Sequence, residues 1–532
     1  MSTQRRPDYS DPDLAATSPR GKLLFAPVIR SAMSRIVARL FKGSARRYSA
    51  VLLVWIILLI IFRTHLGSYS IAVPSGLLEC APSWQHAGIV GPTTPDRAVV
   101  SESWLQLQEI FDAHPPQPAS LPHKVWDANN GQANWDLIKS WTQISEQDAN
   151  ATRAVHEDLL RILPEYPLKR YSRRGIITLA GGKWSEYAAT GLGVLREIGS
   201  SLPVEVWMKN KNDVKEGWCQ GLEKEGMACR LLSDYMDVSK VQHGYQFKIL
   251  TMLFSSFEEF LFLDADNIAV SNPDVVFDSE GYLKNGAVLW PDYWKNPASP
   301  WTPYITGVSD NAAQTWNEEL TVESGQIVWN KHRHWRSLCL AAYYNYYGPQ
   351  YYWTLISQGH SGWGDKDTFP TALQALGEPF YKIPHGVKTA FVTGTSLGIA
   401  MLQASPTNEK AFEPMFLHAN IYKWSIMDYL CTGCYPTADD PNRGYSENPS
   451  ATINPHLRAG RRVLAKIEDL SLDPEPLIWK SMERTACRSV WKDDGLCHRT
   501  RDFMSKAFGF RFKIGKVAAA LGLEAEPCLE IA

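Results

Sequence analysis

An apolar run that ends in a pair of carboxylates is the feature that most constrains how this chain of 532 residues folds. Residues 260–263 are all apolar and have the composition of a buried β-strand, and Asp264 and Asp266 follow where that strand would stop. Side chains alternate along a strand, so we expect both carboxylates to point the same way. Two carboxylates at the carboxyl end of a buried strand can hold a divalent cation, which in turn can hold a diphosphate. The competing interpretation is a solvated loop, because acidic pairs end many strands.

From about residue 170, the sequence alternates between strand and helix patterns. The expected elements are strands at 175–180 and 203–208 with a helix at 185–199 between them, a short apolar stretch at 228–235 and a helix at 245–260. This alternation predicts an α/β fold in which a mostly parallel, Rossmann-like sheet carries helices on both faces. Ligands of such sheets bind beyond the carboxyl ends of the strands.

Two glycines follow the first expected strand. Gly181 and Gly182 permit a tight turn and a close approach of the backbone to a ligand. Because the carboxyl ends of parallel strands meet at one edge of a sheet, we expect these glycines to lie on the same edge as Asp264 and Asp266.

A pair of aspartates usually needs a further protein ligand to hold Mn²⁺ or Mg²⁺. Both cations prefer oxygen ligands, and Mn²⁺ also accepts imidazole. His418 follows another apolar stretch and is the leading candidate, although a single histidine is more often a hydrogen-bonded structural residue. Lys248 and Lys423 are candidates for contacts with a diphosphate. The alternatives are a snorkelling lysine at 248 and a solvated surface lysine at 423.

The segment 322–335 resembles a loop packed with polar groups that leads into a short strand at 327–330. It contributes Glu323 and Gln326 as candidate site residues.

A second polar loop, residues 362–370, places Asp365 and Asp367 after Gly364. A glycine before a carboxylate lets the backbone come close to a ligand. The alternative is that one of the aspartates caps the helix that follows, and both interpretations can hold together. Aromatic residues that could stack on a sugar face are Trp363, Trp290, Tyr293 and Trp294.

The N-terminal region has the pattern of a membrane signal. Residues 1–47 contain ten Lys and Arg against three Asp, and residues 50–62 are apolar throughout. A cleaved signal peptide and a buried core helix compete with an uncleaved signal-anchor helix. We favour a signal-anchor transmembrane helix at 48–66, because the basic preface is long for a secretory peptide. The positive-inside bias then leaves the N-terminus in the cytosol and the rest of the chain in a lumen.

Two further observations agree with a lumenal body. Asn150-Ala151-Thr152 is an acceptor triplet for N-glycosylation, and nine cysteines fit an oxidising compartment. Cys219 and Cys229 lie close in sequence, as do Cys487 and Cys497, but the sequence does not reveal which cysteines pair. Cys431 and Cys434 have the C-x-x-C spacing of a redox-active pair, for which we favour a structural disulfide. The net charge of −2 implies no general affinity for nucleic acid.

At this point the chain resembles a known family. The segments GGKWSEYA, LPVEVWM, GYQFKILTMLFSSFEEFLFLDADNIAVSNPDVVFDS, GAVLWPDYW, ESGQIVWNK, GDKDTF and LHANIYKW follow, in order, the pattern of the fungal Golgi α-mannosyltransferases of glycosyltransferase family 71. These Mnn-type enzymes extend mannan and N-glycan outer chains. The resemblance covers about 170 to 430. It implies a GT-A fold, single-pass type II topology in the Golgi membrane, GDP-mannose as donor, Mn²⁺ (or Mg²⁺) as metal and retention of the α configuration.

The resemblance also suggests a role for each candidate residue. The expected metal ligands are Asp264, Asp266 and His418; the expected catalytic residues are Glu323, Gln326, Asp365 and Asp367; and the expected donor-binding residues are Gly181, Gly182, Lys183, Lys248 and Lys423. One departure is Ala269, where the family commonly has proline. It is expected to alter only the stiffness of a loop.

Five regions are therefore expected along the chain. They are a disordered basic cytosolic tail at 1–47, the signal-anchor helix at 48–66, a lumenal stem and N-terminal extension at 67–165, a GT-A catalytic domain at 166–435 and a C-terminal extension at 436–532. The last region shows no strong match to the family pattern.

Several alternatives stay open on the sequence. A GT-A transferase that uses a UDP-sugar follows the same acidic-pair logic, and a non-catalytic, membrane-anchored sugar-binding subunit keeps the fold without turnover. A glycosidase fits poorly, because its two carboxylates must flank the scissile bond. Transfer with an α-1,2 linkage is favoured over α-1,3. A homo- or hetero-oligomer is compatible with the sequence.

Overall fold

The computed structural model divides the chain into two compact units, residues 1–80 and 81–532. The described residues all lie in the second unit and comprise 89–122, 141–168, 170–215, 217–308, 319–360, 362–426, 453, 456–468, 470, 472–487, 495–513 and 528–530. The predicted basic tail, the predicted signal-anchor helix and the Cys431/Cys434 pair lie outside these residues. Among the helices that are described, none combines the length and the apolar character needed to cross a bilayer.

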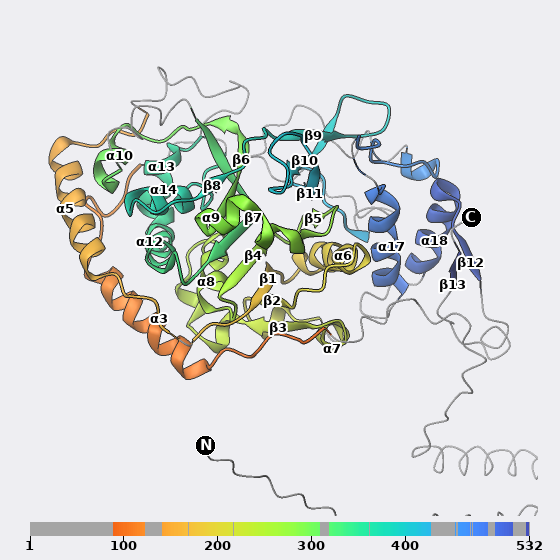
Figure 1. Ribbon diagram of the computed structural model, residues 1–532, viewed down its shortest axis with the longest axis horizontal. Coiled ribbons are helices and arrows are strands. Elements are labelled where there is room, and N and C mark those ends of the chain that lie inside the picture. The colour runs from red at the N-terminus through yellow and green to blue at the C-terminus, as the bar shows by residue number, and fades with distance from the viewer. Residues whose placement is uncertain are drawn as a thin grey trace, which may run out of the picture. The chain divides into compact units, whose positions relative to one another are not determined.

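Within the described residues, a seven-stranded sheet has the order β3-β2-β1-β4-β7-β6-β8 (Figure 1). Its strands are β1 Arg174–Leu179, β2 Val204–Met208, β3 Met227–Leu231, β4 Glu259–Leu263, β6 Ala287–Lys295, β7 Leu320–Asn330 and β8 Tyr381–Lys382. Strands β3, β2, β1 and β4 run parallel, and β8 runs parallel to β6, whereas β7 is antiparallel to both β4 and β6. The predicted α/β fold with a mostly parallel sheet is confirmed, and the sheet is mixed.

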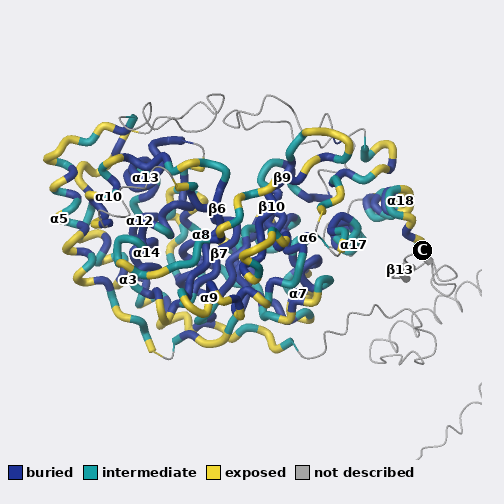
Figure 2. The backbone as a smooth tube through the Cα atoms, turned by 45° about the horizontal axis from the view of Figure 1, so that its top comes forward, coloured by how far each residue is buried: buried dark blue, intermediate teal, exposed yellow. Residues whose placement is uncertain are grey.

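Helices cover both faces of this sheet (Figure 1). On one face lie α3 Arg97–Asp112, α5 Glu146–Ile162, α8 Gln246–Phe254, α10 Trp301–Thr306, α12 Trp335–Tyr346, η8 Gly348–Tyr352, α13 Trp353–Ser357 and α14 Thr368–Ala375. On the other lie α6 Trp184–Glu197, α7 Trp218–Glu223 and α9 Glu280–Asn285, and α17 Pro474–Cys487 packs on α6. Successive residues of β1 serve the two faces, since Ile177 packs in the core cluster of α8 while Ile176 packs in that of α6. Figure 2 shows the strands at the centre as buried.

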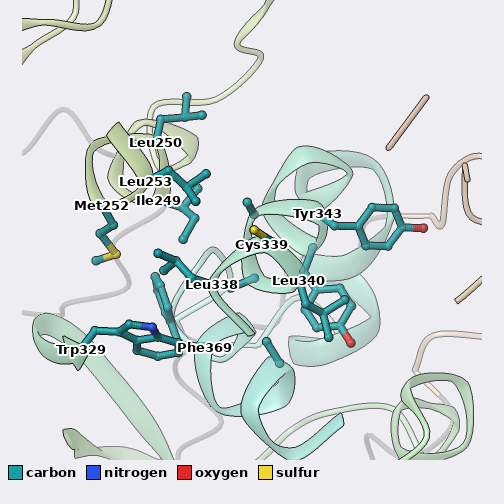
Figure 3. Packing of buried hydrophobic residues seen from close by; sticks show 14 of the residues in the cluster. Ile249, Leu250, Met252, Leu253, Trp329, Leu338, Cys339, Leu340, Tyr343 and Phe369 are labelled. Carbon is teal, nitrogen blue, oxygen red and sulfur yellow. The ribbon is translucent and has the colours of Figure 1, made fainter. Parts of the chain in front are cut away.

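The larger core cluster joins the N-terminal helices to the sheet. Leu253 of α8, Leu338 and Tyr343 of α12 and Trp329 of β7 contribute to it (Figure 3). Trp104 and Phe111 of α3 belong to the same cluster. Part of the predicted stem and N-terminal extension is therefore packed against the body of this unit.

A four-stranded antiparallel sheet, again counted over the described residues, lies beside the first, in the order β5-β11-β10-β9. Its strands are β5 Asn267–Ala269, β9 Lys388–Phe391, β10 Gly398–Ala404 and β11 Pro414–His418. In the register between β5 and β11, His418 is opposite Asn267. Because β5 begins directly after the acidic pair, this register brings His418 to the end of β4.

Helix α17 packs on α6, and α18 Leu496–Phe508 packs on α17. Gly193 of α6 lies so close to α17 that a Cβ there would sit 1.9 Å from the Ser481 Oγ, and that hydroxyl donates to the Thr190 carbonyl oxygen at 2.9 Å. The other described elements are β12 Arg511–Lys513, β13 Cys528–Glu530, η4 Lys211–Asp213, η5 Leu232–Asp234, η6 Val238–Lys240 and η7 Pro273–Asp278. Disulfides join Cys219 to Cys229 and Cys487 to Cys497, a pairing that the sequence left open.

Two predicted elements are wrong in extent. The helix expected at 245–260 ends at Phe254, because the Ser255 carbonyl oxygen turns to accept a hydrogen bond of 2.8 Å from the Lys331 ammonium and β4 begins at Glu259. The polar loop expected at 322–335 is mostly the buried strand β7. Its backbone pairs with β4 on one side and β6 on the other, and these partners outweigh its polar composition.

Candidate active site

The acidic pair lies on a turn between the two sheets. The Asn267 amide donates to the Asp264 carbonyl oxygen at 3.0 Å, so the strand alternation expected across Asp264 and Asp266 is wrong. The turn is held from both sides: the Asp264 amide donates to the Gly325 carbonyl at 2.8 Å and the Ala419 amide to the Asp266 carbonyl at 2.9 Å. The two carboxylates converge because of this turn.

Asp264, Asp266 and His418 each offer a ligand atom, and these atoms all lie within 4.8 Å of one another. Asp266 and His418 are buried, and Asp264 is partly exposed. Two carboxylates and one imidazole form an oxygen-rich donor set that suits Mn²⁺ and, less well, Mg²⁺. The residues present therefore fit a divalent cation.

Two lysines carry positive charge to these carboxylates. The Lys248 ammonium lies 3.0 Å from Asp264 Oδ2 and 3.3 Å from Asp365 Oδ2, and it donates to the Ser324 carbonyl at 3.0 Å. The side chain of Lys248 is only 8% exposed, so the alternative of a snorkelling lysine is wrong. The Lys423 ammonium forms an ion pair with Asp266 Oδ2, which excludes a purely solvated role.

The electrostatic environment makes the two aspartates unequal. Burial raises the pKa of Asp264 to about 6, with Lys248 acting in the opposite direction. Burial acts the same way on Asp266, but the Lys423 ammonium and the His418 ring hold the pKa of Asp266 well below its usual range. Burial alone would lower the pKa of His418, but Glu323 and Asp266 raise it to about 10. His418 must therefore release a proton to act as a ligand.

Glu323 orients His418. Its Oε1 atom lies 2.9 Å from His418 Nδ1 and accepts a hydrogen bond of 2.7 Å from the Gly325 amide, and on the other side His418 Nε2 lies 3.3 Å from Asp266 Oδ1. A Cβ at Gly325 would lie 2.6 Å from the His418 ring, so this position requires glycine. A carboxylate behind an imidazole fixes the ring orientation and raises its basicity as a ligand.

Gln326 joins the two sheets at the same place. It is fully buried, and its Oε1 accepts a hydrogen bond of 2.5 Å from Asn267 Nδ2. Several buried atoms of this site have no hydrogen-bond partner among the described residues, including Gln326 Nε2, Asn267 Oδ1, Glu323 Oε2 and, apart from its ion pair with Glu323, His418 Nδ1. Such groups are uncommon in folded proteins and indicate a site where a ligand or water supplies the missing partner. Sequence reasoning missed Asn267, although it follows the acidic pair directly.

The aspartates of the second polar loop have different neighbours. Asp365 belongs to the acidic cluster through Lys248, as described above. Asp367 Oδ1 accepts from the Val322 amide at 3.1 Å, and its Oδ2 lies 3.3 Å from the Lys366 ammonium, which also contacts Asp292 Oδ2 at 3.0 Å. The Asp367 side chain makes no capping hydrogen bond to α14, so the capping alternative is wrong for this residue. Sequence reasoning missed Lys366 and Asp292, whose pairing spans 74 residues.

The glycines after β1 lie on the predicted edge. Thr178 of β1 is paired in register with Leu263 of β4. Gly181 and Gly182, which follow β1, therefore lie at the same edge of the sheet as the acidic pair that follows β4. Both have positive φ angles, 124° and 55°, which favour glycine. Lys183 precedes α6, and its ammonium lies 5.5 Å from the centre of the exposed Trp184 ring.

The aromatic residues predicted to stack on a sugar lie either in the core or at the rim of the active site. Trp290 is fully buried and its Nε1 donates to the Ala404 carbonyl at 2.7 Å, so the expectation that it stacks on a sugar is wrong. Trp363 is half-buried, with its ring centre 5.0 Å from that of Trp353. Tyr245 is 48% exposed and lies against Gly364, where an added Cβ would meet its ring at 2.8 Å. These rings border the loop that carries Asp365.

Tyr293 and Trp294 are also only partly buried. The Tyr293 hydroxyl lies 2.7 Å from Thr389 Oγ1, and the Trp294 ring packs edge-on against His360 with centres 5.5 Å apart. Both stay candidates for sugar contacts.

Comparison with known proteins relates this part of the chain to one group. Residues 173–392 match the family model Mannosyl_trans3, described as "Mannosyltransferase putative". The chain is 33% identical over 291 residues to alpha-1,2-mannosyltransferase MNN24 of Candida albicans, covering 47% of this chain and 41% of the relative. It is 35% identical over 365 residues to MNN22 of the same organism (59% and 62% covered) and 30% identical over 301 residues to MNN2 of Saccharomyces cerevisiae (49% and 50%). The chain thus spans about half the length of the curated relatives it matches.

The solved structures that the comparison found are more distant. The glycosyltransferase GlyE of Streptococcus pneumoniae has a TM-score of 0.25 at 11% identity, covering 40% of this chain and 45% of that chain. The galactosyltransferase LgtC, in complex with donor and acceptor sugar analogs, also has a TM-score of 0.25 at 11% identity, with 40% and 73% covered. These likenesses are too remote to assign any residue.

Proposed function

Because this chain belongs, over residues 173–392, to the Mnn-type family of fungal α-1,2-mannosyltransferases, we propose that it transfers a mannosyl group from GDP-mannose to a hydroxyl group of a mannoside. The acceptor is an N-glycan or mannan chain, and the α configuration is retained. An α-1,2 linkage is favoured over α-1,3, in line with the printed names of the relatives.

The observation that carries this proposal is the convergence of Asp264, Asp266 and His418 at one strand end. These residues would hold Mn²⁺ (or Mg²⁺), which when bound would neutralise negative charge on the GDP leaving group. Lys248 and Lys423 already contact the same carboxylates and are assigned to the diphosphate. The site thus combines the charges that a sugar nucleotide needs.

The donor side of the site is assigned to the end of β1. Gly181 and Gly182 allow the backbone to approach a nucleotide closely, and Lys183 adds a cation beside them. The parallel strands β3, β2, β1 and β4, followed by the reversed β7, support a GT-A fold.

The transfer step is assigned to the loop at the rim. Asp365, held by Lys248, would steady positive charge at the anomeric carbon, while Gln326 and Glu323 keep β7 and His418 in place. Asp367 would hold this loop through Val322 and Lys366. Retention is explained by attack on the same face as departure, with the leaving phosphate taking the proton of the acceptor hydroxyl, so no protein base is required. Trp363 would stack on the acceptor sugar.

We place the protein in the Golgi membrane as a single-pass type II protein, with residues 48–66 as the anchor and the catalytic part in the lumen. The basic residues that precede this segment support the orientation. The disulfides Cys219–Cys229 and Cys487–Cys497 support an oxidising compartment.

The donor is tested by supplying the purified full chain with Mn²⁺, a mannobioside and either GDP-mannose or UDP-sugars. We expect mannose transfer from GDP-mannose alone, with an α-1,2 linkage in the isolated product. Turnover of a UDP-sugar instead would assign the chain to the UDP-dependent alternative. Binding of the mannobioside without turnover of any donor would leave the non-catalytic sugar-binding subunit.

The role of Glu323 is tested by Glu323→Gln. The amide keeps the shape of the side chain but removes the charge that orients His418, so we expect Mn²⁺ affinity to fall about 10- to 100-fold. Mn²⁺ titration followed by thermal shift measures this directly. Glu319→Gln is the control, because that carboxylate precedes β7 and is about half exposed. Unchanged Mn²⁺ affinity in Glu323→Gln would remove Glu323 from the metal site.

A further inference from the structure

A second concave site lies away from the acidic cluster. It is a cavity of about 190 Å³ between α3, α8 and the α12–η8 segment. The residues of its lining that matter here are Trp104, Gln108, Gln242, Asn345, Tyr346 and Gln350. A cavity of about 150 Å³ is enough to hold a benzene ring, so this one has room for a single six-membered ring.

The lining suits a ligand with many hydroxyl groups. It combines amide side chains, which both donate and accept, with the rings of Trp104 and Tyr346. Two charged side chains, Asp112 and Lys240, also line the cavity, and the Asp112 carboxylate accepts a hydrogen bond of 2.7 Å from the Tyr346 hydroxyl. Gln350 donates to Gln242 Oε1 through its amide nitrogen, whereas its own Oε1 is a buried atom without a hydrogen-bond partner. Because that oxygen is not exposed to the cavity, the Gln350 amide must turn toward the cavity before a ligand hydroxyl can donate to it.

The cavity and the active-site rim share one wall. Gln242 lines the cavity, and the next residue, His243, packs edge-on against Trp363 at the rim, with ring centres 5.6 Å apart. Tyr245 follows on the same short segment, its ring centre 4.5 Å from that of His243. The segment that contributes Gln242 to the cavity therefore also borders the rim of the active site.

A chain of hydrogen bonds also connects the cavity to the catalytic loop. Gln246 Nε2 donates to the Asn345 carbonyl at 2.8 Å, and Asn345 Nδ2 donates to Thr368 Oγ1 at 2.8 Å. The Thr368 hydroxyl then donates to the Asp365 carbonyl at 2.6 Å. Gln246 and Asn345 both line the cavity, so its wall is continuous with the support of Asp365.

We propose that this cavity is a remote acceptor subsite, which binds one mannosyl unit of an oligomannoside whose non-reducing end lies at the active site. The proposal rests on the proposed function in that the ligand class is that of the acceptor. It makes the protein an enzyme that prefers extended chains over short ones.

The test compares the Michaelis constants of the full chain for a mannobioside and for a linear α-hexamannoside at saturating GDP-mannose. We expect KM for the hexamannoside to be lower by about tenfold, the contribution of one or two hydrogen bonds. Gln350→Leu removes the unpaired acceptor and should bring the ratio of the two KM values close to one. Ala342→Leu fills the cavity from α12 and should do the same. Gln220→Leu on the exposed face of α7 is the matched control and should keep the wild-type ratio.

The proposal is overturned if the two KM values of the wild-type protein are nearly equal. It is also overturned if the tenfold difference in KM persists in both cavity variants, because the cavity would then be a water-filled gap. Binding without chemistry separates this failure from failure of the proposed function. Saturation-transfer NMR with hexamannoside alone should detect binding that Gln350→Leu weakens and Gln220→Leu does not. If GDP-mannose is never turned over but this binding is seen, the subsite stands and the mannosyltransferase assignment fails.

Discussion

Replacement of Asp264 by asparagine is expected to reduce mannosyl transfer on the order of 10³-fold, because several kcal/mol of stabilisation of the leaving group depend on this carboxylate. Asp264 is the better of the two aspartates to change. Its partner Lys248 keeps Asp365 and Ser324 after the substitution, so no buried charge is left alone. In Asp266→Asn, by contrast, Lys423 loses its carboxylate partner and His418 keeps only Glu323, so stability is expected to fall as well.

The experiment measures initial rates with GDP-mannose alongside the melting temperature. Wild-type protein should be stabilised by Mn²⁺ with GDP more than by either alone, and Asp264→Asn should lose that shift while melting within a few degrees of wild type. Asp278→Asn is the matched control, since that carboxylate is 74% exposed. Normal turnover by a folded Asp264→Asn protein would discard the metal assignment.

Replacement of Trp479 by alanine is expected to lower the free energy of unfolding by about 3 to 5 kcal/mol, the usual cost of deleting a buried aromatic side chain. Trp479 of α17 is fully buried, and its ring centre lies 4.1 Å from that of Phe503 in α18. The same helix packs on α6 through Ser481 and Gly193. The substitution should therefore destabilise the catalytic domain as well as the C-terminal helices.

Urea denaturation followed by circular dichroism and by residual transfer activity measures this effect. Both signals should shift together to lower urea. Leu472→Ala is the control, because that side chain is 47% exposed and should change stability by about 0.5 kcal/mol or less. Separate transitions, with activity persisting after the helical signal of the variant is lost, would mean that the C-terminal helices are not needed by the catalytic body.

Local patterns predicted the sheet edge well. The apolar run at 260–263, the glycines at 181 and 182 and the intervening helix–strand alternation each depend on residues near in sequence. The rule that parallel strands end at one edge then joined them, and the register of β1 with β4 agrees. Cys219 and Cys229 are also close in sequence, 10 residues apart, but that they pair with each other came from the structure.

Other features followed from contacts between distant segments. Strand β7 carries the polar residues Glu323 and Gln326, which by composition favour a loop, yet two flanking strands and the site make it a buried strand. Trp290 looked like a sugar-stacking residue and is instead a core residue, because β6 turns it toward β10. The Lys366–Asp292 pair was not predictable, since no local pattern relates residues 74 positions apart.

The sequence alone predicts most helices and strands and the strand end at which the acidic groups lie. These features depend on the backbone geometry of residues that are close in sequence. What the folded chain added is the direction of each charged group: a turn, absent from any periodic pattern, aims Asp264 and Asp266 together, and the β5–β11 pairing brings His418 to them across some 150 residues. This pairing depends on which distant surfaces bury one another. The free energy of that burial is gained only when the two sheets come into contact.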